Sequence, residues 1–535
     1  MSRHLLALGL ALEAIFLVAV AGPFSLLKSG TELTDLGKLT DYQPLAAVLV
    51  TAGLIGLFVL YTIALGVARR PHPLAPSPLE MERGWPRPGV PSPSPMERGP
   101  ADTLREGGGR PSAALLVALG FTALFSVTLV FLYPVTAIDV YNYAVEGHVA
   151  VFHHLNPMVS PPAQAVGDTF VSYAGTWADS TSPYGPIWIT LTKLDALLAG
   201  SNVVVAILLL KALAAVALVA TALLLAWAFG GQGPRSGALA VVLFGWNPLV
   251  QLEMVGNGHN DAVMTFFLIA ALALLTKNRP VLSALGVGAS VLVKFLTLGA
   301  IPLFLLARIL DSPRSHRGRL VTVVASAAAL VALAVVAYAP FWAGPTTLQR
   351  ALAADSDYLS SIPALIVLVI PGSINWLAFP RLALVGIVCL WQANSLRLGR
   401  ANLAQAMYEV FFVTILVGAH FAGWYLALLV AVSALTRDRW VQLRTVVFTF
   451  TATLATPLWA YLWYWNQDWM SMTTIHLIVV PLTFLPPLLI ALLAMDWPSR
   501  GLWRHRGSQS SYLDALYFEL HDAYVTARSA VGSST

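Results

Sequence analysis

Residues 138–157 read IDVYNYAVEGHVAVFHHLNP, and this stretch begins where the apolar segment 113–134 stops. It gathers acidic, histidine and asparagine side chains in a chain that is 57% hydrophobic and 11% charged. A carboxylate at the mouth of a membrane span is costly to keep near hydrocarbon, so Asp139 is a functional candidate. The alternative is an ordinary interfacial loop with a solvated acid, and the rest of the chain has to decide between the two.

Repeated apolar runs make up most of the 535 residues, and the mean hydropathy is +0.73. They predict an all-α, polytopic transmembrane protein with about 12–14 spans. Residues 1–67 are expected to form an N-terminal pair of transmembrane helices, and residues 113–495 the transmembrane catalytic domain. The run 5–27 has no convincing small-residue cleavage site, which indicates a retained span and not a signal peptide. The single cysteine, Cys389, excludes an intrachain disulfide.

Two segments have a different composition. Residues 68–112 are rich in Pro, Gly, Ser, Arg and Glu, and they contain the imperfect repeat PSPLEMERG and PSPSPMERG. Such a segment cannot bury a core, so we expect a disordered cytoplasmic loop; a regulatory docking loop is the alternative. Residues 496–535 are basic and then amphipathic, which predicts a cytoplasmic tail.

The distribution of charge predicts an orientation. Basic residues gather in short loops that can share one side with both termini, and that side is the cytoplasm. The unusual polar residues then lie on the opposite side, which predicts one extracytoplasmic active site in a multi-pass cell-membrane protein. Segment 184–200 would invert this order if it crossed, so we expect a re-entrant or interfacial helix. The net charge of +5 gives no indication of nucleic acid as a partner.

Two further motifs place polar groups against apolar runs. In VGNGHNDAVM, 255–264, the polar residues could be a helix N-cap cluster, but four of them in five positions favour a ligand-binding role. Lys294 lies in the middle of the apolar hairpin 281–309, where an ammonium costs about 2.5–3.5 kcal/mol. Snorkelling to the interface is one interpretation of Lys294. We favour the other, a lysine at a helix break that reaches an anionic phosphate.

Aromatic residues and histidines have competing interpretations too. Trp424 and Tyr425, like Tyr184 and Trp188, could form an interfacial aromatic belt or a surface on which sugar rings stack. The pair His153–His154 suggests a metal, but two adjacent histidines on a helix cannot easily face one ion, and no third ligand has zinc-site spacing. We therefore predict no metal and no cofactor.

Taken in order, the motifs resemble a known family. D-x-Y-x-Y…G…NP, S-x-YGP-x-W, N-x-HNDA-x-M, V-K-x-x-x-L and F-x-x-WY are similar to motifs of the bacterial polyprenol-phosphomannose-dependent α-1,6-mannosyltransferases, which are membrane glycosyltransferases of the GT-C superfamily. The resemblance covers roughly residues 113–436, and HNDAVM is its most specific element. One block departs from the pattern, because the position that often holds Gly-Arg holds Gly147–His148.

The resemblance implies a GT-C-like fold and a hexosyltransferase. It would move a sugar, with mannose the best candidate, from a polyprenyl-phosphate donor in the lipid bilayer to a glycan or lipid-linked acceptor. Asp139 would be the base of an inverting reaction, and Lys294, with His259 or His148 in support, would meet the phosphate. The substrate-binding residues would be Tyr141, Tyr143, His148, Asn156, Asp179, Tyr184, Trp188, Asn257, His259, Asn260, Asp261, Lys294, His420, Trp424 and Tyr425.

Two other functions would also use buried polar residues. A lipid-linked sugar flippase or other secondary transporter is the first, although transporters place such residues near the midplane between repeats, and no repeat is visible outside the Pro-rich loop. A non-enzymatic scaffold or sensor is the second, and the clustering of acid, histidine and lysine argues against it.

Overall fold

The computed structural model describes residues 1–29, 44–69, 111–229, 234–311, 316–349, 358–436, 438–464 and 471–494. The chain divides into a large unit, Met1–Ile490, and a second unit, Ala491–Thr535, whose described residues are 491–494 at the end of the last helix. The expected loop 68–112 and tail 496–535 lie almost wholly outside the described residues.

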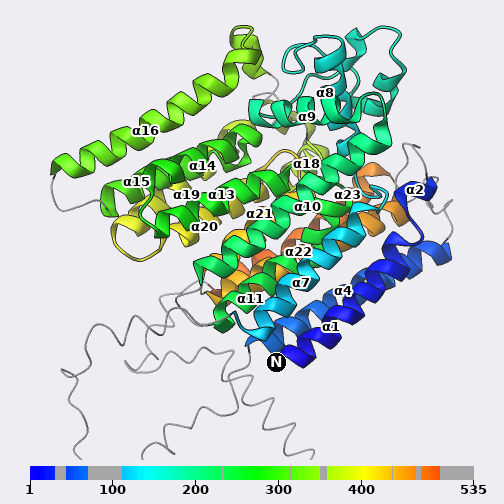
Figure 1. The fold of residues 1–535 in the computed structure, drawn as a ribbon, viewed down its shortest axis with the longest axis horizontal. Helices are drawn as coiled ribbons and strands as arrows, with labels where there is room; N and C mark the ends of the chain where they lie inside the picture. The colour runs from blue at the N-terminus through cyan, green and yellow to red at the C-terminus, as the bar shows by residue number, and fades with distance from the viewer. Residues whose placement is uncertain are drawn as a thin grey trace, which may run out of the picture. The chain divides into compact units, whose positions relative to one another are not determined.

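Helices account for nearly all the regular structure of the described residues, and isolated bridges join Ser25 to Leu132 and Leu359 to His420. The predicted all-α fold class is therefore confirmed (Figure 1). The first half of the chain forms α1 (Ser2–Ile15), η1 (Phe16–Ala21), α2 (Leu26–Ser29), α4 (Pro44–Arg69), α7 (Ala113–Val130), α8 (Asp139–Phe152), η3 (Pro162–Gln164), η4 (Thr169–Trp177), α9 (Pro186–Ala199) and α10 (Val203–Ala228).

The second half continues in the same way. It forms α11 (Pro234–Gly245), α12 (Pro248–Val250), η5 (Gln251–Gly256), α13 (Asp261–Thr276), α14 (Pro280–Val293), η6 (Phe295–Thr297), α15 (Ala300–Asp311), α16 (His316–Tyr338), η7 (Ala339–Phe341), η8 (Pro345–Leu348), α18 (Ile362–Val369), η10 (Pro371–Asn375), α19 (Ala378–Arg397), α20 (Leu403–Val417), η11 (Gly423–Tyr425), α21 (Leu426–Leu435), α22 (Arg439–Tyr464) and α23 (Met472–Ala494).

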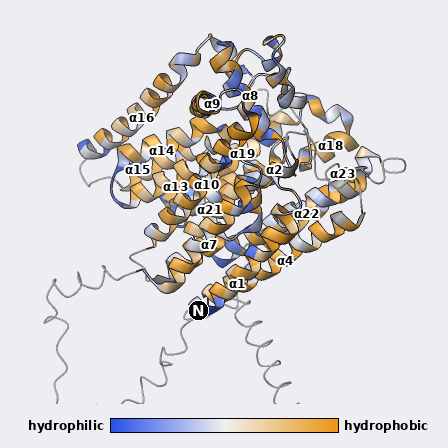
Figure 2. Cartoon of the chain, turned by 45° about the vertical axis from the view of Figure 1, so that its right-hand side comes forward, coloured by the Kyte–Doolittle hydropathy of each residue, from blue (hydrophilic) through white to orange (hydrophobic). Residues whose placement is uncertain are grey.

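Many helices are long and apolar enough to cross a bilayer. Seven of the described helices meet that test, and up to eight if the bent pair 236–245 and 248–256 is one span. Further apolar helices of 10–17 residues include α13, α14 and α20. The chain is thus a multi-pass membrane protein, and apolar residues cover most of its long helices (Figure 2). The expected number of about 12–14 crossings stays a prediction.

Lipid-facing surface is clearest on α16. Only 6% of the most apolar stretch of this helix is buried, and valines such as Val321, Val331 and Val336 are exposed. In water such a face would be unfavourable, whereas in hydrocarbon it has no cost. In contrast α13 packs against α10, α14 and α21, and this inner group of helices carries much of the candidate site.

Breaks in the helices have local causes. Between α11 and α12 the chain bends by 54°, where the Asn247 side chain accepts the backbone N–H groups of Leu249 and Val250 and Pro248 begins the new helix. Between α14 and η6, Lys294 has extended backbone angles of φ −155° and ψ 130°. The helix break expected at Lys294 is therefore present, and it turns the ammonium away from its own helix.

Helices α8 and α9 lie side by side, and both contact α10 (Figure 1). Their crossing is close because a Cβ atom at Gly147 would lie 2.1 Å from the backbone oxygen of Thr192. At 14 residues α9 is about 21 Å long, shorter than the roughly 30 Å hydrocarbon core. That length fits the expected re-entrant or interfacial helix at 184–200, which stays a prediction.

Candidate active site

Four helix ends meet at the candidate site. Asp139 is the first residue of α8, Asp261 is the first residue of α13, and Pro186 begins α9, whereas Lys294 follows the last residue of α14. Helix N-termini favour negative charge and C-termini favour positive charge, so each charged residue lies at the end that suits it. The same three N-termini also favour an anionic ligand.

A close backbone contact joins two of these ends. The N–H of Gly185 donates to the carbonyl oxygen of Val293 at 3.1 Å. A Cβ atom at residue 185 would lie 2.0 Å from the backbone oxygen of Leu292, so only glycine fits there. The glycine of the YGP motif therefore seats Tyr184 next to the end of α14, where Lys294 begins to turn away.

An ion pair lies at the centre of the site. Lys294 Nζ donates to Asp261 Oδ2 at 2.7 Å; the Asp261 side chain is fully buried and the Lys294 side chain is 14% exposed. The ammonium is 4.7 Å from the ring centroid of Tyr425 and 5.9 Å from that of Tyr184. Aromatic faces attract a desolvated cation within about 6 Å of the ring centroid, and both rings lie within that distance of the ammonium.

Asp139 lies next to this pair through Tyr184. The Tyr184 hydroxyl donates to Asp139 Oδ1 at 3.3 Å. The Tyr143 ring packs at about a right angle against the rings of Tyr184 and Trp188, with centroids 5.1 and 5.0 Å apart. Burial raises the pKa of Asp139 above its usual range, and the Lys294 charge and the Tyr184 hydroxyl oppose that rise. The carboxylate therefore holds a proton more readily than a solvated aspartate does.

A second polar group surrounds Glu253 in η5. Asn257 Nδ2 donates to Glu253 Oε2 at 2.7 Å, and the Thr136 hydroxyl donates to Glu253 Oε1 at 3.2 Å. The His259 Nε2 atom lies 3.4 Å from Glu253 Oε2, and the His259 ring stacks on Trp424 with centroids 4.0 Å apart. Sequence reasoning did not select Glu253; its signal was a carboxylate four residues before Asn257, on the same helical face.

These contacts bear on the structural alternatives that the sequence left open for two motifs. The helix that starts at Asp261 has no side-chain cap from Asn260, and Asn257 bonds Glu253 and Thr136 instead, so the polar run is not an N-cap cluster. The Lys294 ammonium ends on the buried carboxylate of Asp261, and its side chain is 14% exposed. The side-chain atoms of Asn260, Asp261 Oδ1 and Trp188 Nε1 are buried without a hydrogen-bond partner among the described residues, which is unusual for such groups.

Several predicted residues lie elsewhere. His148 is nine residues after Asp139 on α8, about 14 Å along the helix axis, and its Nε2 contacts Asp168 Oδ2 at 2.9 Å. Asn156 donates to the Phe341 carbonyl oxygen at 2.7 Å, and Tyr141 stacks on Tyr173 at 6.3 Å. Asp179 is exposed. The expected role of His148 in phosphate binding therefore stays a prediction without a supporting contact. The His420 and Tyr425 ring centroids lie 6.4 Å apart.

An apolar pocket reaches the edge of the site. Its walls come from η1, α4, η5 and α22, and its lining includes the polar residues Thr136, Glu253 and Asn257. Apolar side chains dominate the rest of the lining, with Val20, Phe24, Val50, Leu54, Leu132, Val135, Leu249, Leu252 and Pro457 among them. A hydrocarbon chain would fit such walls better than a sugar would.

Fold and site together define a multi-pass helical membrane protein with charged groups buried at converging helix ends. Residues 102–310 match a family described as "Alpha-(1->6)-mannopyranosyltransferase, N-terminal domain". This segment contains Asp139, Tyr184, Asp261 and Lys294. The resemblance predicted from the sequence motifs is therefore confirmed.

Individual relatives agree with the family match. Alpha-(1->6)-mannopyranosyltransferase A of Mycobacterium tuberculosis is 27% identical over 64% of this chain and 63% of its own length. The protein of the same description from Corynebacterium glutamicum is 25% identical over 33% of this chain and 36% of its own length. The chain thus spans less than two thirds of these curated relatives. An oligosaccharyltransferase structure from Archaeoglobus fulgidus matches 70% of this chain and 52% of its own with a TM-score of 0.34 and 16% identity.

Proposed function

We propose that the chain is a membrane hexosyltransferase that moves a sugar, with mannose the best candidate, from a polyprenyl-phosphate donor to a glycan or lipid-linked acceptor. The observation that carries the proposal is the Lys294–Asp261 pair, next to Asp139 and Tyr184, in the segment that matches the mannopyranosyltransferase family. Mannose is proposed as the sugar from the names of the relatives. The transfer reaction is proposed from the buried charged groups.

Asp139 is the proposed general base. It removes the proton from an acceptor hydroxyl, the hydroxyl oxygen attacks the anomeric carbon, and the bond to the phosphate oxygen breaks with inversion. A base works best when its pKa approaches the working pH, and burial raises the pKa of Asp139 in that direction. Tyr184 keeps one carboxylate oxygen in place through its hydroxyl.

Lys294 is the proposed partner of the departing phosphate. The charge on the phosphate grows as the glycosidic bond breaks, and an oriented cation in a site with little water stabilises that charge strongly. Asp261 holds one hydrogen of the ammonium, which leaves its other hydrogens for the phosphate oxygens. The N-termini of α8, α9 and α13 add favourable dipoles for the same anion.

Features around the ion pair support a sugar and a lipid as substrate parts. The unpartnered atoms of Trp188, Asn260 and Asp261 are hydrogen-bonding groups that sugar hydroxyls can satisfy. Stacked His259 and Trp424 offer an aromatic surface. The apolar pocket whose lining includes Glu253 and Asn257 suits the hydrocarbon chain of a lipid-linked substrate.

A transfer assay tests the proposal. The purified chain is incubated with polyprenyl-phosphate mannose, polyprenyl-phosphate glucose and a mannosyl acceptor, and products are analysed by mass spectrometry and by anomeric configuration. We expect a new mannosidic bond, free polyprenyl phosphate and inversion at the anomeric carbon. Movement of the lipid-linked sugar between leaflets without bond cleavage would instead identify a transporter.

The face of the membrane needs its own test. In a chain whose Cys389 is replaced by alanine, a cysteine at Ser180 should react with an impermeant thiol reagent from outside intact cells, because the site is proposed to be extracytoplasmic. A cysteine at Ser508 should react only after permeabilisation. The reverse pattern would move the site to the cytoplasm, where sugar-nucleotide donors are available.

A further inference from the structure

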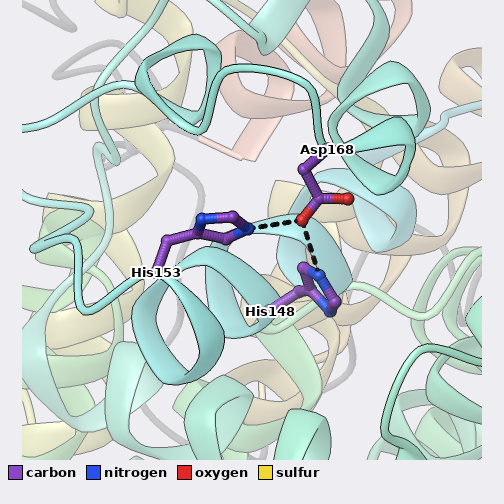
Figure 3. Close-up of side chains that lie close together, drawn as sticks. All are labelled: His148, His153 and Asp168. Atoms are coloured by element: carbon purple, nitrogen blue, oxygen red, sulfur yellow. Dashed lines mark hydrogen bonds and ion pairs between the residues drawn. The ribbon is translucent and has the colours of Figure 1, made fainter.

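The far end of α8 carries a cluster that the transferase proposal does not use. Nε2 of His148 and Nε2 of His153 lie 2.9 and 2.6 Å from the same atom, Asp168 Oδ2 (Figure 3). Both rings point toward the carboxylate from α8 and the residue after it, while Asp168 comes from the loop before η4 (Figure 3). The three ligand-type atoms lie within 4.8 Å of one another.

Neighbouring groups fix two members of the cluster. Asp168 Oδ1 accepts the backbone N–H of Phe170 at 2.8 Å, which turns Oδ2 toward the histidines. The Phe170 ring lies flat on the His148 ring, with centroids 4.1 Å apart and an interplanar angle of 7°. Nε2 of His148 is the ring nitrogen that faces Asp168, and it is therefore the candidate ligand atom, whereas Nδ1 is buried without a hydrogen-bond partner among the described residues.

We propose that His148, His153 and Asp168 form a binding site for one zinc ion, with the remaining coordination position open to water. Two imidazoles and one carboxylate are a donor set that zinc takes in proteins, with three protein ligands and a water in the fourth place. The side chain of His153 is 34% exposed and that of Asp168 is 16% exposed, so an ion can enter from solvent.

The geometry needs only a small adjustment. Zinc–nitrogen and zinc–oxygen bonds of about 2.0–2.2 Å place tetrahedral ligands roughly 3.3 Å apart. The distance from Asp168 Oδ2 therefore has to lengthen by roughly 0.4 Å to His148 Nε2 and roughly 0.7 Å to His153 Nε2. The more exposed His153 side chain can supply most of this change, so Asp168 keeps its bond from the Phe170 N–H. An ion then replaces the hydrogen bonds that join the three groups at present.

A zinc ion at this site would stabilise the loop and would take no part in sugar transfer. It ties the end of α8 to the start of η4, and the same loop leads through Ser182 to Tyr184, which bonds Asp139. Metal binding contributes to stability when the unfolded chain has no preformed site. The inference is independent of the proposed transferase activity, because it predicts metal binding and stability even in a chain that transfers nothing.

The sequence pattern hid this site for a specific reason. The neighbouring pair His153–His154 draws attention, yet His154 has a positive φ of 55° and does not join the cluster. The second imidazole is His148, five residues earlier, and the carboxylate comes 15 residues after His153. Only the path of the loop back to α8 makes them neighbours.

The test uses the full chain, purified in detergent through a tag without histidines and stripped with a chelator. Zinc chloride is added, free metal is removed by dialysis, and bound zinc is counted by elemental analysis; Co²⁺ replaces zinc for a visible absorption spectrum. The variants are His148→Ala, His153→Ala and Asp168→Ala. His154→Asn is the matched control, since it removes an adjacent exposed imidazole and asparagine tolerates positive φ.

We expect about one zinc per wild-type chain, with affinity at least tenfold lower in each ligand variant and unchanged in His154→Asn. Zinc should raise the melting temperature of the wild type and of the control only. If a ligand variant is already less stable without metal, the zinc-induced shift still decides, because each chain is compared with itself. No zinc bound by the wild type at micromolar concentration, or equal binding in His153→Ala, would leave a hydrogen-bonded His–Asp–His group without a metal and overturn the proposal.

Discussion

The polar side chains at the two ends of α8 lie in different environments. At its start, Asp139 lies next to buried groups that come from α9, α13 and α14, and the nearby cation is already paired with Asp261. At its end, His148 and His153 share one carboxylate oxygen near solvent. Charged groups in little water suit the stabilisation of a reacting anion, whereas two imidazoles and a carboxylate that meet at a solvent-accessible edge suit a metal ion.

This contrast gives a physical reason to separate two residues that the sequence places together. Asp139 and His148 lie within one short stretch, and the sequence predicts both in one active site, whereas it predicts no role there for His153. A helix separates them, because nine residues advance the chain by about 14 Å. Substitutions of Asp139, Lys294 and Glu146 probe the reacting end of α8 and the helix between its two ends, in order of decreasing expected effect.

Asp139→Asn should abolish transfer and leave the other end of α8 intact. Asparagine keeps the shape and still accepts from the Tyr184 hydroxyl, but it cannot take the acceptor proton. We expect transfer to fall by about 10²–10⁴-fold, with melting temperature and zinc content unchanged. The rate is measured in the polyprenyl-phosphate mannose assay. A variant that retains more than about a tenth of the rate would remove Asp139 from the base role, and loss of zinc would break the separation of the two ends.

Lys294→Met should reduce transfer by about 10²-fold through both kcat and the KM for the donor. Methionine keeps the unbranched stem but removes the charge that meets the phosphate, so every acceptor should show the same loss. The single variant should also melt at a lower temperature, because Asp261 becomes a buried carboxylate without its cation.

The double variant Lys294→Met/Asp261→Asn separates stability from function. It removes both charges, so it should regain much of the lost stability without regaining transfer. Recovery of donor kinetics in the double variant would show that the pair is structural. Normal donor kinetics in Lys294→Met alone would have the same meaning.

Glu146 lies between the two ends of α8 and should give a small, pH-dependent effect. It is 1% exposed and accepts from Asn142 Nδ2 at 3.1 Å; burial raises its pKa to about 8, against the bonds from Ser182 and Asn142. Because the folded pKa of Glu146 is raised, its contribution to folding stability is largest below its unfolded pKa of 4.5. That contribution is lost as the pH rises toward 8.

The matched comparison is Glu146→Gln, which cannot titrate. The melting temperature of the wild type relative to the variant should fall by about 3 °C between pH 5 and pH 8 and then level off. Melting curves at constant ionic strength measure it. A difference that stays constant with pH would show that Glu146 is ionised throughout and sits in a more hydrated place than its burial indicates.

Local sequence determined a large part of this protein. Apolar runs predict the all-α membrane fold because polar backbone cannot face hydrocarbon without helical hydrogen bonds, and that fold class is confirmed. The motifs around Asp139, Asp261 and Lys294 also predicted the resemblance that the family match confirms. The length of the apolar runs and the order of the motifs can both be read along the chain without knowing which residues are neighbours in space.

Only the tertiary structure decided which polar residues meet. Lys294 reaches Asp261 across 33 residues because α13 and α14 pack together. His259 lies near Glu253, and its ring stacks on Trp424 from a distant part of the chain. Asp168 returns to His148 along a loop. A polar side chain in an apolar segment indicates from sequence alone that it needs a partner. The identity of the partner depends on how distant segments pack together, and neither hydropathy nor residue spacing contains that information.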